Sequence, residues 1–552
     1  MRVRLLMLSL FLAAAAGLTV FFFSPYAPVI EPLRPIEEIW DLEDARQESA
    51  AALVTRLERD GVPLGYDEES NTFYCPIPLD SVEWPALSLR APGVPGLHMC
   101  FADDYLYDSP ADAMAGGVAY QVFAYTDKEF SYFSLVFTGM TQVCLFGDES
   151  LFGDDDVPIE AAVAGGDRSV FYSARTHYRG GVTRASPKHN YRLEFTGKSN
   201  GKKKIPRDIP GIGESVKNLI LIPMVYDRTL MRDRLSWDVY ADSIPEDEPF
   251  GKRAVQYAEL FVNDSYQGVY LMLEPFDYTE ELLRAGEKHT ETDYVYRVGL
   301  QRRKPWTDGA YFPGRGFALY YTPPGAEDHP FEGLSDYRDL IGETDDGAFW
   351  EKALERLDLT SMIRHMLLVQ GGGYTDNVLN NLYIWADKTS GKTVYRFFPW
   401  DMDATWGDRE NRIGPEFDYW IYFPTLDRLI DLDTEGSIRP LIVQEWQRLR
   451  AHTLSESFIE ERLMQYVHEL NDSGAAQRNG ERWDFGVVLA DAEPILTFLS
   501  VRLPLIDEAV SAIGNAQGRI EWLQYSDYEN KSRQMKREWF ALPQQEDTEG
   551  AP

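Results

Sequence analysis

The sequence predicts an α+β protein built from several parts, and three observations lead to this fold class. Short runs rich in β-branched and aromatic residues, separated by Gly, Pro and Asp, fill residues 71–148. Strand-like and helix-like segments alternate over residues 158–423, and amphipathic helical patterns dominate residues 426–535. Apolar residues recur with a period of 2 in strands and 3.6 in helices, which is how the two are told apart. A chain of 552 residues is also long enough for more than one domain.

Residues 1–30 predict a signal peptide or a signal-anchor helix. Arg2 and Arg4 precede an uncharged apolar run from Leu5 to Phe23. A cleaved signal has an apolar run of roughly 7–15 residues, whereas a spanning helix needs roughly 20. The three phenylalanines that end the run do not suit a small-residue cleavage site, which favours the uncleaved anchor, although both alternatives stay open. The basic flank stays in the cytoplasm, so the remainder of the chain is expected to be extracytoplasmic.

Two parts are expected before the main domain. Residues 31–70 read as a linker with a short helix, because prolines give way to helical spacing over residues 37–60. Residues 71–153 have the short, turn-separated strands typical of a small β-sandwich. An exported compartment permits a disulfide, and Cys75–Cys100 and Cys100–Cys144 are the pairings considered. The sequence has no CxxC motif or Cys/His cluster, which disfavours structural zinc.

The mixed segments define a core over residues 154–430, followed by a helical extension over 431–540 and a disordered tail over 541–552. No internal repeat of 20–50 residues is visible, so solenoids and propellers are disfavoured. Within the core and its extension, strands are expected at 189–195, 217–223, 257–264, 268–274 and 394–400, and helices at 228–242, 359–372, 438–453, 456–471 and 487–513.

The composition describes an acidic, folded protein. Lys and Arg number 54 against 89 Asp and Glu, which gives a formal charge of −35. Phosphate binding along a nucleic acid needs clustered Lys and Arg, so nucleic acid is excluded as the main partner. Hydrophobic residues make up 44% of the chain, enough to bury real cores and to exclude an acidic disordered protein.

The most informative stretch places acids and amides at the ends of predicted elements. Asp376 and Asn381 lie between a predicted helix and a strand, and Asp401 and Asp403 follow the next strand. Carboxylate and amide oxygens are hard ligands that suit Mg²⁺ or Mn²⁺. Asp-Asn pairs also form ordinary turns, and each segment alone favours that interpretation. Together, in alternating helix–strand context, they favour a phosphoryl-transfer site.

A basic segment stands out against the acidic background. Residues 178–195 concentrate Arg179, Lys188 and Arg192 around two glycines that free the backbone to approach an anion. A basic hairpin that pairs with surface acids is an equally good interpretation of this segment alone. The segment has no standard phosphate-loop motif.

Five ordered blocks resemble the CotH kinase-like family, named for spore-coat protein H. Residues 376–383 and 399–407 carry the acidic motifs. The other blocks are RG…SPK…YR over 179–192, DRTLMR over 227–232 and ELFVNDSYQGVYLMLE over 259–274. The β-rich segment before them is similar to the domain that precedes the core in extracytoplasmic bacterial members. The resemblance implies an atypical, two-lobed protein-kinase-like core that transfers phosphate from ATP to protein hydroxyls.

The resemblance also implies a role for each residue. Asp376 matches the catalytic carboxylate. Asn381 and Asp401 match the metal-binding residues, with Asp403 as a helper or second ligand. Lys188 matches the lysine that holds nucleotide phosphates, and Glu274 falls at the interlobe hinge. We therefore expect Lys188, Arg179, Arg192 and Glu274 to bind ATP, with Mg²⁺ or Mn²⁺ as the second cofactor.

The functional hypothesis is an exported atypical kinase that phosphorylates Ser or Thr of an envelope, coat or secreted protein. The acidic charge points to a basic protein substrate. We expect a monomer that contacts the membrane only through residues 1–30 if these are uncleaved. The alternatives are a non-catalytic pseudokinase or adhesin that binds a partner through its β-domain, and transfer to an acceptor other than protein, such as a glycan.

Overall fold

The architecture below is that of a computed structural model. It describes residues 29–516 except for 32–33, 85–87, 104, 167, 181, 199–200, 213–214, 246–251, 278–292, 299–316, 379, 389–390, 408–419, 422 and 484–488. Nearly all of the predicted signal or anchor segment, and the whole of the predicted tail, lie outside the described residues. None of the helices in the described part of the chain has the length and hydrophobicity to span a bilayer.

The chain divides into two compact units that interleave in sequence. The first takes the described parts of Met1–Arg228, Ala254–Pro275 and Gln465–Ala490. The second takes those of Thr229–Arg253, Phe276–Met464 and Asp491–Pro552. The expected boundaries at 71–153, 154–430 and 431–540 do not coincide with this division, because the chain passes between the units several times. The two-lobed kinase arrangement stays a prediction, as do those domain boundaries.

The first unit begins with a seven-stranded sheet of order β1-β7-β8-β9-β6-β5, in which β2 also pairs with β9. One face buries Phe73, Val122 and Leu135, and α2 contributes Ile39 to a smaller cluster with Cys100 and Phe123. The elements are β1 (Ile30–Glu31), α2 (Ile36–Asp44), β2 (Gln47–Glu48), β5 (Gly65–Asp67), β6 (Thr72–Pro76), β7 (His98–Phe101), α3 (Pro110–Ala115), β8 (Ala119–Tyr125) and β9 (Glu129–Thr138).

This region differs from the expected β-sandwich. Its strands form one sheet, and the strand over Thr141–Phe146 joins a separate barrel. The helical pattern of residues 37–60 yields only the short α2, after which the chain turns into β2. Cys75, Cys100 and Cys144 are all buried and free, so neither disulfide forms.

A closed barrel of order β10-β11-β12-β13-β16-β18-β17 completes the first unit. Parallel pairing of β10 with β17 closes it, and its interior holds Val143, Leu193, Leu219 and Leu260. The barrel strands are β10 (Thr141–Phe146), β11 (Val157–Gly165), β12 (Arg168–Arg179), β13 (Asn190–Phe195), β16 (Asn218–Ile222), β17 (Val255–Val262) and β18 (Ser265–Leu273). Two small hairpins, β3 (Glu58–Arg59) with β4 (Val62–Pro63) and β14 (Arg207–Asp208) with β15 (Ser215–Val216), accompany it.

A helix from much later in the chain packs on this barrel. The helix α12 (Ala475–Trp483) lies against β18. It falls within the predicted helical extension over 431–540, although the sequence predicts no individual helix at these residues. Gly268 of β18 has a φ of +87°, and a Cβ at this position would lie 2.5 Å from Asn479 Oδ1. The close approach of α12 to β18 therefore requires glycine at this position.

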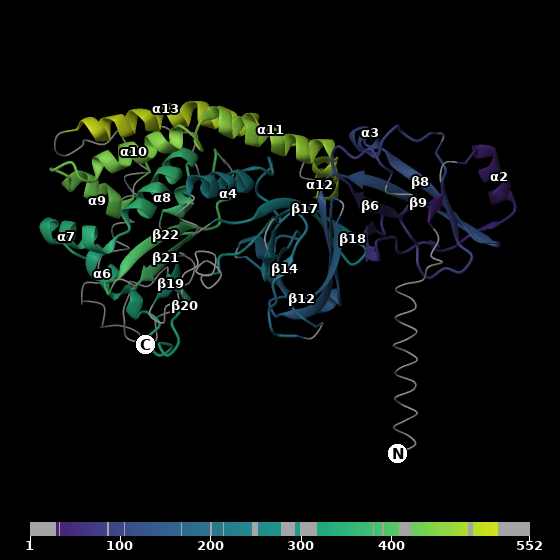
Figure 1. Cartoon of the computed structure of the whole chain (residues 1–552), viewed down its shortest axis with the longest axis horizontal. Helices are drawn as coiled ribbons and strands as arrows, with labels where there is room; N and C mark the ends of the chain where they lie inside the picture. The colour runs from purple at the N-terminus through teal and green to yellow at the C-terminus, as the bar shows by residue number, and fades with distance from the viewer. Residues whose placement is uncertain are drawn as a thin grey trace, which may run out of the picture. The chain divides into compact units, whose positions relative to one another are not determined.

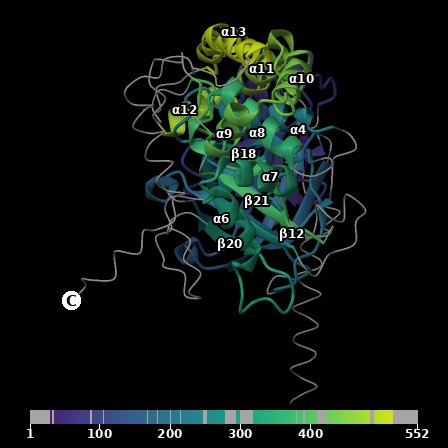
Figure 2. The same ribbon diagram turned by 90° about the vertical axis from the view of Figure 1, so that its left-hand side faces the viewer.

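The second unit contains a four-stranded sheet of order β20-β19-β21-β22 and most of the helices (Figure 1). Helix α8 packs on β22, and α10 and α13 lie side by side and both contact α8 (Figures 1 and 2). The strands are β19 (Tyr294–Val298), β20 (Phe317–Tyr321), β21 (Leu382–Asp387) and β22 (Val394–Pro399). The helices are α4 (Arg232–Ser243), α6 (Ser335–Ile341), α7 (Asp346–Arg356), α8 (Leu359–Gly372), α9 (Pro424–Leu432), α10 (Arg439–Arg450) and α13 (Glu493–Asn515), while α11 (Glu456–Asp472) contains the division between the units.

Most of the expected core and tail elements are confirmed. Helix α8 has the expected bounds because Asp358 caps its start, accepting the Ser361 N–H, and Gly373 ends it in the left-handed conformation. The expected helix at 228–242 begins four residues late, at Arg232, since Leu230 has a φ of +61°. The mixed α+β class is confirmed.

Candidate active site

The Asp376 turn connects α8 to β21 in the second unit. Asp376 lies in the 3₁₀ turn η5 (Thr375–Asn377), directly after the α8 C-cap. Its Oδ2 accepts the side-chain amides of Asn380 at 3.1 Å and Asn381 at 2.8 Å. Two amide donors on one oxygen fix the orientation of this carboxylate. The structure therefore brings together Asp376 and Asn381.

The Asp401 turn lies at the same end of the β21–β22 hairpin. Leu382 pairs with Pro399, so Asn381 and Trp400 are the next residues beyond the ladder. The Trp400 N–H donates to the Asn381 carbonyl at 2.8 Å, and Asp401 follows directly. Asn381 and Asp401 have φ values of +49° and +55°. Asn and Asp tolerate this left-handed conformation better than most residues, yet it persists only where surrounding contacts enforce it.

Helix α4 holds the loop that follows Asp401. Ser236 Oγ lies 3.2 Å from the Met402 carbonyl and 3.1 Å from Thr405 Oγ1, and it accepts the Trp406 Nε1–H at 2.8 Å. The Trp406 N–H donates to the Gly372 carbonyl at the end of α8. Sequence reasoning missed Ser236, because a serine within a helix carries no signal for a contact about 170 residues away.

The carboxylates of these turns influence one another. Burial raises the pKa of Asp403 well above its usual range, and the negative charges of Asp401, Asp233 and Asp376 raise it further. Asp233 comes from the first turn of α4 and is only 1% exposed. Sequence reasoning also missed Asp233, because it lies one residue beyond the Asp227–Arg232 block that carries the resemblance. Like charges in one region are unfavourable unless a cation or a proton offsets them.

The donor set fits a divalent ion that is shared with a nucleotide. In the described ranges, no group of three or more His, Cys, Asp or Glu is arranged to hold an ion alone. Mg²⁺ usually takes only one or two carboxylates and completes its octahedron with substrate phosphates and water. Asn381, Asp401 and Asp403 offer that chemistry, and an ion would relieve the repulsion that acts on Asp403.

The predicted nucleotide lysine belongs to the first unit. Lys188 is fully buried, and its Nζ donates to the Pro223 carbonyl at 2.9 Å, the Val269 carbonyl at 2.6 Å and Asn479 Oδ1 at 2.9 Å. Burial lowers the pKa of Lys188 well below its usual value, while three acceptors favour the ammonium. All three N–H donors of the ammonium are thus used inside this unit.

The other expected nucleotide-binding residues also belong to the first unit. Arg179 ends β12 and pairs in the ladder with Asn190, while Arg192 on β13 lies 3.3 Å from Glu194. Glu274 is buried just after β18, and its N–H donates to the Ala254 carbonyl. Arg184 of the basic segment pairs with Asp154 at 3.0 Å, as the surface-hairpin interpretation expects. The binding roles of these residues stay predictions.

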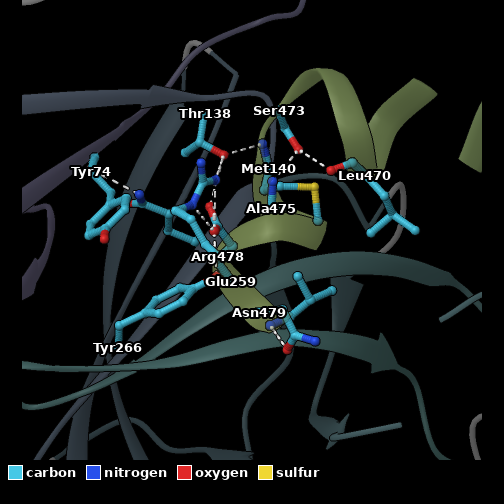
Figure 3. A network of polar contacts seen from close by, with 12 residues as sticks. Tyr74, Thr138, Met140, Glu259, Tyr266, Leu470, Ser473, Ala475, Arg478 and Asn479 are labelled. Carbon is cyan, nitrogen blue, oxygen red and sulfur yellow. Dashed lines mark hydrogen bonds and ion pairs between the residues drawn. The ribbon is translucent and has the colours of Figure 1, made fainter. Parts of the chain in front are cut away.

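A buried polar network lies along α12 (Figure 3), and Asn479 connects α12 to Lys188. Glu259 of β17 is fully buried and accepts Arg478 Nε at 2.9 Å, Thr138 Oγ1 at 2.8 Å and Tyr266 Oη at 2.8 Å. Arg478 Nη2 also donates to Thr138 Oγ1 at 3.1 Å. The next residue of α12 is Asn479, and its Oδ1 accepts hydrogen bonds from Lys188 Nζ and from the Val269 N–H. The network attaches α12 to the barrel.

A mixed α+β fold whose hairpin gathers Asp376, Asn381 and Asp401 has the residue types that phosphoryl transfer requires. The chain belongs to the CotH kinase protein family, whose match covers residues 176–530. That range contains every site residue predicted from the sequence. Membership implies kinase-like phosphotransferase activity, which in general uses ATP and a divalent metal. No curated protein matches the chain.

Proposed function

We propose that the chain is an exported atypical kinase that transfers the γ-phosphate of ATP to Ser or Thr of an envelope, coat or secreted protein. The observation that carries the proposal is the convergence of Asp376, Asn381 and Asp401 on one end of the β21–β22 hairpin. Positioning and electrostatic stabilisation supply most of the catalysis in phosphoryl transfer, so fixed polar groups of this kind are what the reaction needs.

The residues divide the work between them. Asp376, held by two amides, orients the attacking hydroxyl and accepts its proton. Asn381, Asp401 and Asp403 would hold Mg²⁺ or Mn²⁺, which when bound offsets charge on the nucleotide phosphates. The formal charge of −35 favours a basic protein substrate through long-range attraction. Export follows from the apolar N-terminal run.

A second candidate is a non-catalytic partner-binding protein, and one observation favours it. Lys188 matches the phosphate-binding lysine by sequence. All three N–H donors of its ammonium are hydrogen-bonded to acceptors of its own unit. A kinase whose lysine contacts phosphate needs at least one of these donors for the nucleotide.

The test is transfer of radiolabelled phosphate from ATP to a lysine-rich, serine-containing protein by the full chain with Mn²⁺ or Mg²⁺. We expect Asp376→Asn, which removes the positioned base, to lose about 100-fold or more in rate. Asp401→Ala, which removes a predicted metal ligand, should lose a comparable factor. Asp339→Asn is the matched control, because Asp339 is a surface acid of the same unit that pairs only with neighbouring Arg338 in the described contacts.

Nucleotide binding separates the two candidates. Calorimetric binding of ATP that requires metal, together with transfer that both variants lose, supports the kinase. Absence of ATP binding supports the non-catalytic candidate, because the Lys188 donors are already used, and ATP binding without transfer contradicts kinase activity on this substrate. Absence of ATP binding with or without metal contradicts the kinase outright.

A further inference from the structure

We infer that Asn377 is a positioning residue that fixes the Asp376 turn against the Asp401 turn. The inference rests on the proposed function, because it assigns the geometry of that site to one buried amide. Asn377 itself would touch neither nucleotide nor acceptor. Its effect passes through the backbone carbonyls of Asn381 and Trp400.

The contacts of the Asn377 side chain span both turns. Asn377 is fully buried, and its Nδ2 donates to the Asn381 carbonyl at 2.9 Å and to the Trp400 carbonyl at 2.7 Å. Both partners are carbonyls, so the nitrogen must be the amide atom that faces them. One carbonyl belongs to a predicted metal ligand, and the other belongs to the residue just before Asp401.

The backbone of Asn377 is itself anchored to α8. Its carbonyl accepts a hydrogen bond from His365 Nε2 at 2.8 Å, and its N–H donates to the Tyr374 carbonyl at 2.9 Å. His365 lies within α8 and is 2% exposed. Burial lowers the pKa of His365 to about 4, so the imidazole is neutral at neutral pH. Since its partner is a carbonyl, Nε2 carries the proton.

The Asn377 amide lies where it can control the conformation of both turns of the site. The β21–β22 ladder ends at Leu382 and Pro399. Beyond it, the hydrogen bond from the Trp400 N–H to the Asn381 carbonyl still connects the two strands. The carbonyls of these same two residues both receive the Asn377 amide. Asn381 and Asp401 hold left-handed conformations there, which surrounding contacts must maintain. Removing the amide leaves two buried carbonyls without this donor, and the turns relax to find others.

A purely structural role predicts something different from a positioning role. A structural bond would change stability alone, whereas a positioning bond changes metal affinity and rate at a given stability. Asn471 supplies the matched control. Its side chain also ties a loop through two bonds, from Nδ2 to the Ala490 carbonyl and from the Ala490 N–H to Oδ1, at 3.0 and 2.8 Å. It belongs to the first unit.

The experiment compares Asn377→Leu, Asn377→Ser and Asn471→Ala in the full chain. Leu keeps the branched shape but has no donor, and Ser restores one donor. Mn²⁺ binding is measured by electron paramagnetic resonance in the presence of a non-hydrolysable ATP analogue, because the described residues hold no ion alone, and kcat and KM for ATP are measured separately. We expect about 10-fold weaker Mn²⁺ binding and at least 10-fold lower kcat for Asn377→Leu, with Asn377→Ser between it and the wild type. Asn471→Ala should stay within 2-fold.

Each outcome decides the inference. Wild-type Mn²⁺ affinity and kcat in a folded Asn377→Leu overturn it and leave the proposed function standing. Equal losses in Asn377→Leu and Asn471→Ala also overturn it, since a stability effect would then suffice. If Asn377→Leu fails to fold, Asn377→Ser carries the test by the same criteria. If the wild type transfers no phosphate while Asn377→Leu still weakens Mn²⁺ binding, the proposed kinase fails and the positioning role stands.

Discussion

The two units of the chain treat buried charge in opposite ways. In the first unit, Glu259 receives Arg478, Thr138 and Tyr266, and the Lys188 ammonium has three acceptors. In the second unit, burial raises the pKa of Asp403, and three other carboxylates raise it further. The first arrangement satisfies its charges internally. The second keeps like charges together.

This difference indicates that the Glu259 and Lys188 contacts of the first unit stabilise the fold, whereas the carboxylates around Asp403 suit a ligand. Breaking one partner of a buried, compensated pair is costly, because the remaining charge stays buried alone. Removing one of several like charges relieves repulsion, and so does binding a cation. The sign of a stability change therefore reports the kind of site.

Glu259→Ala should destabilise the first unit by about 3–5 kcal/mol, since it leaves the largely buried Arg478 guanidinium without its fully buried carboxylate. Chemical denaturation followed by tryptophan fluorescence measures this. Asp242→Ala, which removes an exposed pair with Arg462, is the control and should change stability by less than about 1 kcal/mol. A loss below 1 kcal/mol for Glu259→Ala would remove the contrast between the units.

Acid should weaken the second unit through His365. Its pKa is about 4 in the folded protein, below the ordinary value near 6.5, so the unfolded chain binds more protons between these values. This contribution is fully present above pH 6.5, and about 3 kcal/mol is lost as the pH falls from 6.5 to 4. Denaturation curves across this range measure the slope. His365→Gln retains a donor for the Asn377 carbonyl without titrating, and should have a shallower pH dependence.

Lys188→Met tests whether Lys188 stabilises the fold or binds the nucleotide. A lysine that serves the fold should cost about 2–3 kcal/mol when removed, because three buried acceptors lose their donor. A lysine that serves only the nucleotide should abolish ATP binding at unchanged stability. Thermal unfolding and calorimetry on the same preparation separate the two results. We expect the stability loss.

Asp403→Asn should stabilise the second unit by roughly 1 kcal/mol at pH 7 in metal-free buffer, because it removes a carboxylate whose ionisation its neighbours oppose. Millimolar Mn²⁺ added with a non-hydrolysable ATP analogue should raise the Tm of the wild type more than that of this variant. Thermal scans with and without Mn²⁺ measure both effects. Destabilisation of the metal-free variant would mean that Asp403 has a stabilising partner rather than repelling neighbours.

The sequence alone was sufficient for the parts of the site that are local. Asp376 and Asn381 are five residues apart on a turn, and Asp401 follows the partner strand of the same hairpin, so motif and element order bring them together. Helix α8 was predictable for the same reason, since its cap and apolar spacing are contained within it.

The remaining features depend on contacts between distant segments. Ser236 and Asp233 reach the site from α4, and Asn377 has its effect only through Trp400, on the far side of the hairpin. The barrel closes by pairing β10 with β17, which turn patterns cannot reveal. Over residues 475–483 the pattern is polar, and α12 is stable there because the barrel supplies partners for Arg478 and Asn479.

The return of the chain to the barrel in α12 has a consequence for biosynthesis. Lys188 and its acceptor Asn479 are separated by 291 residues. At ribosomal speeds of about 5–20 residues per second, Asn479 is made roughly 15–60 s after Lys188. During that interval the barrel lacks its last helix, and Glu259 lacks Arg478. The first unit to be translated is therefore among the last to be finished, and a nascent chain that stops before residue 475 carries a barrel in which Glu259 lacks its guanidinium partner and Lys188 lacks one of its three acceptors.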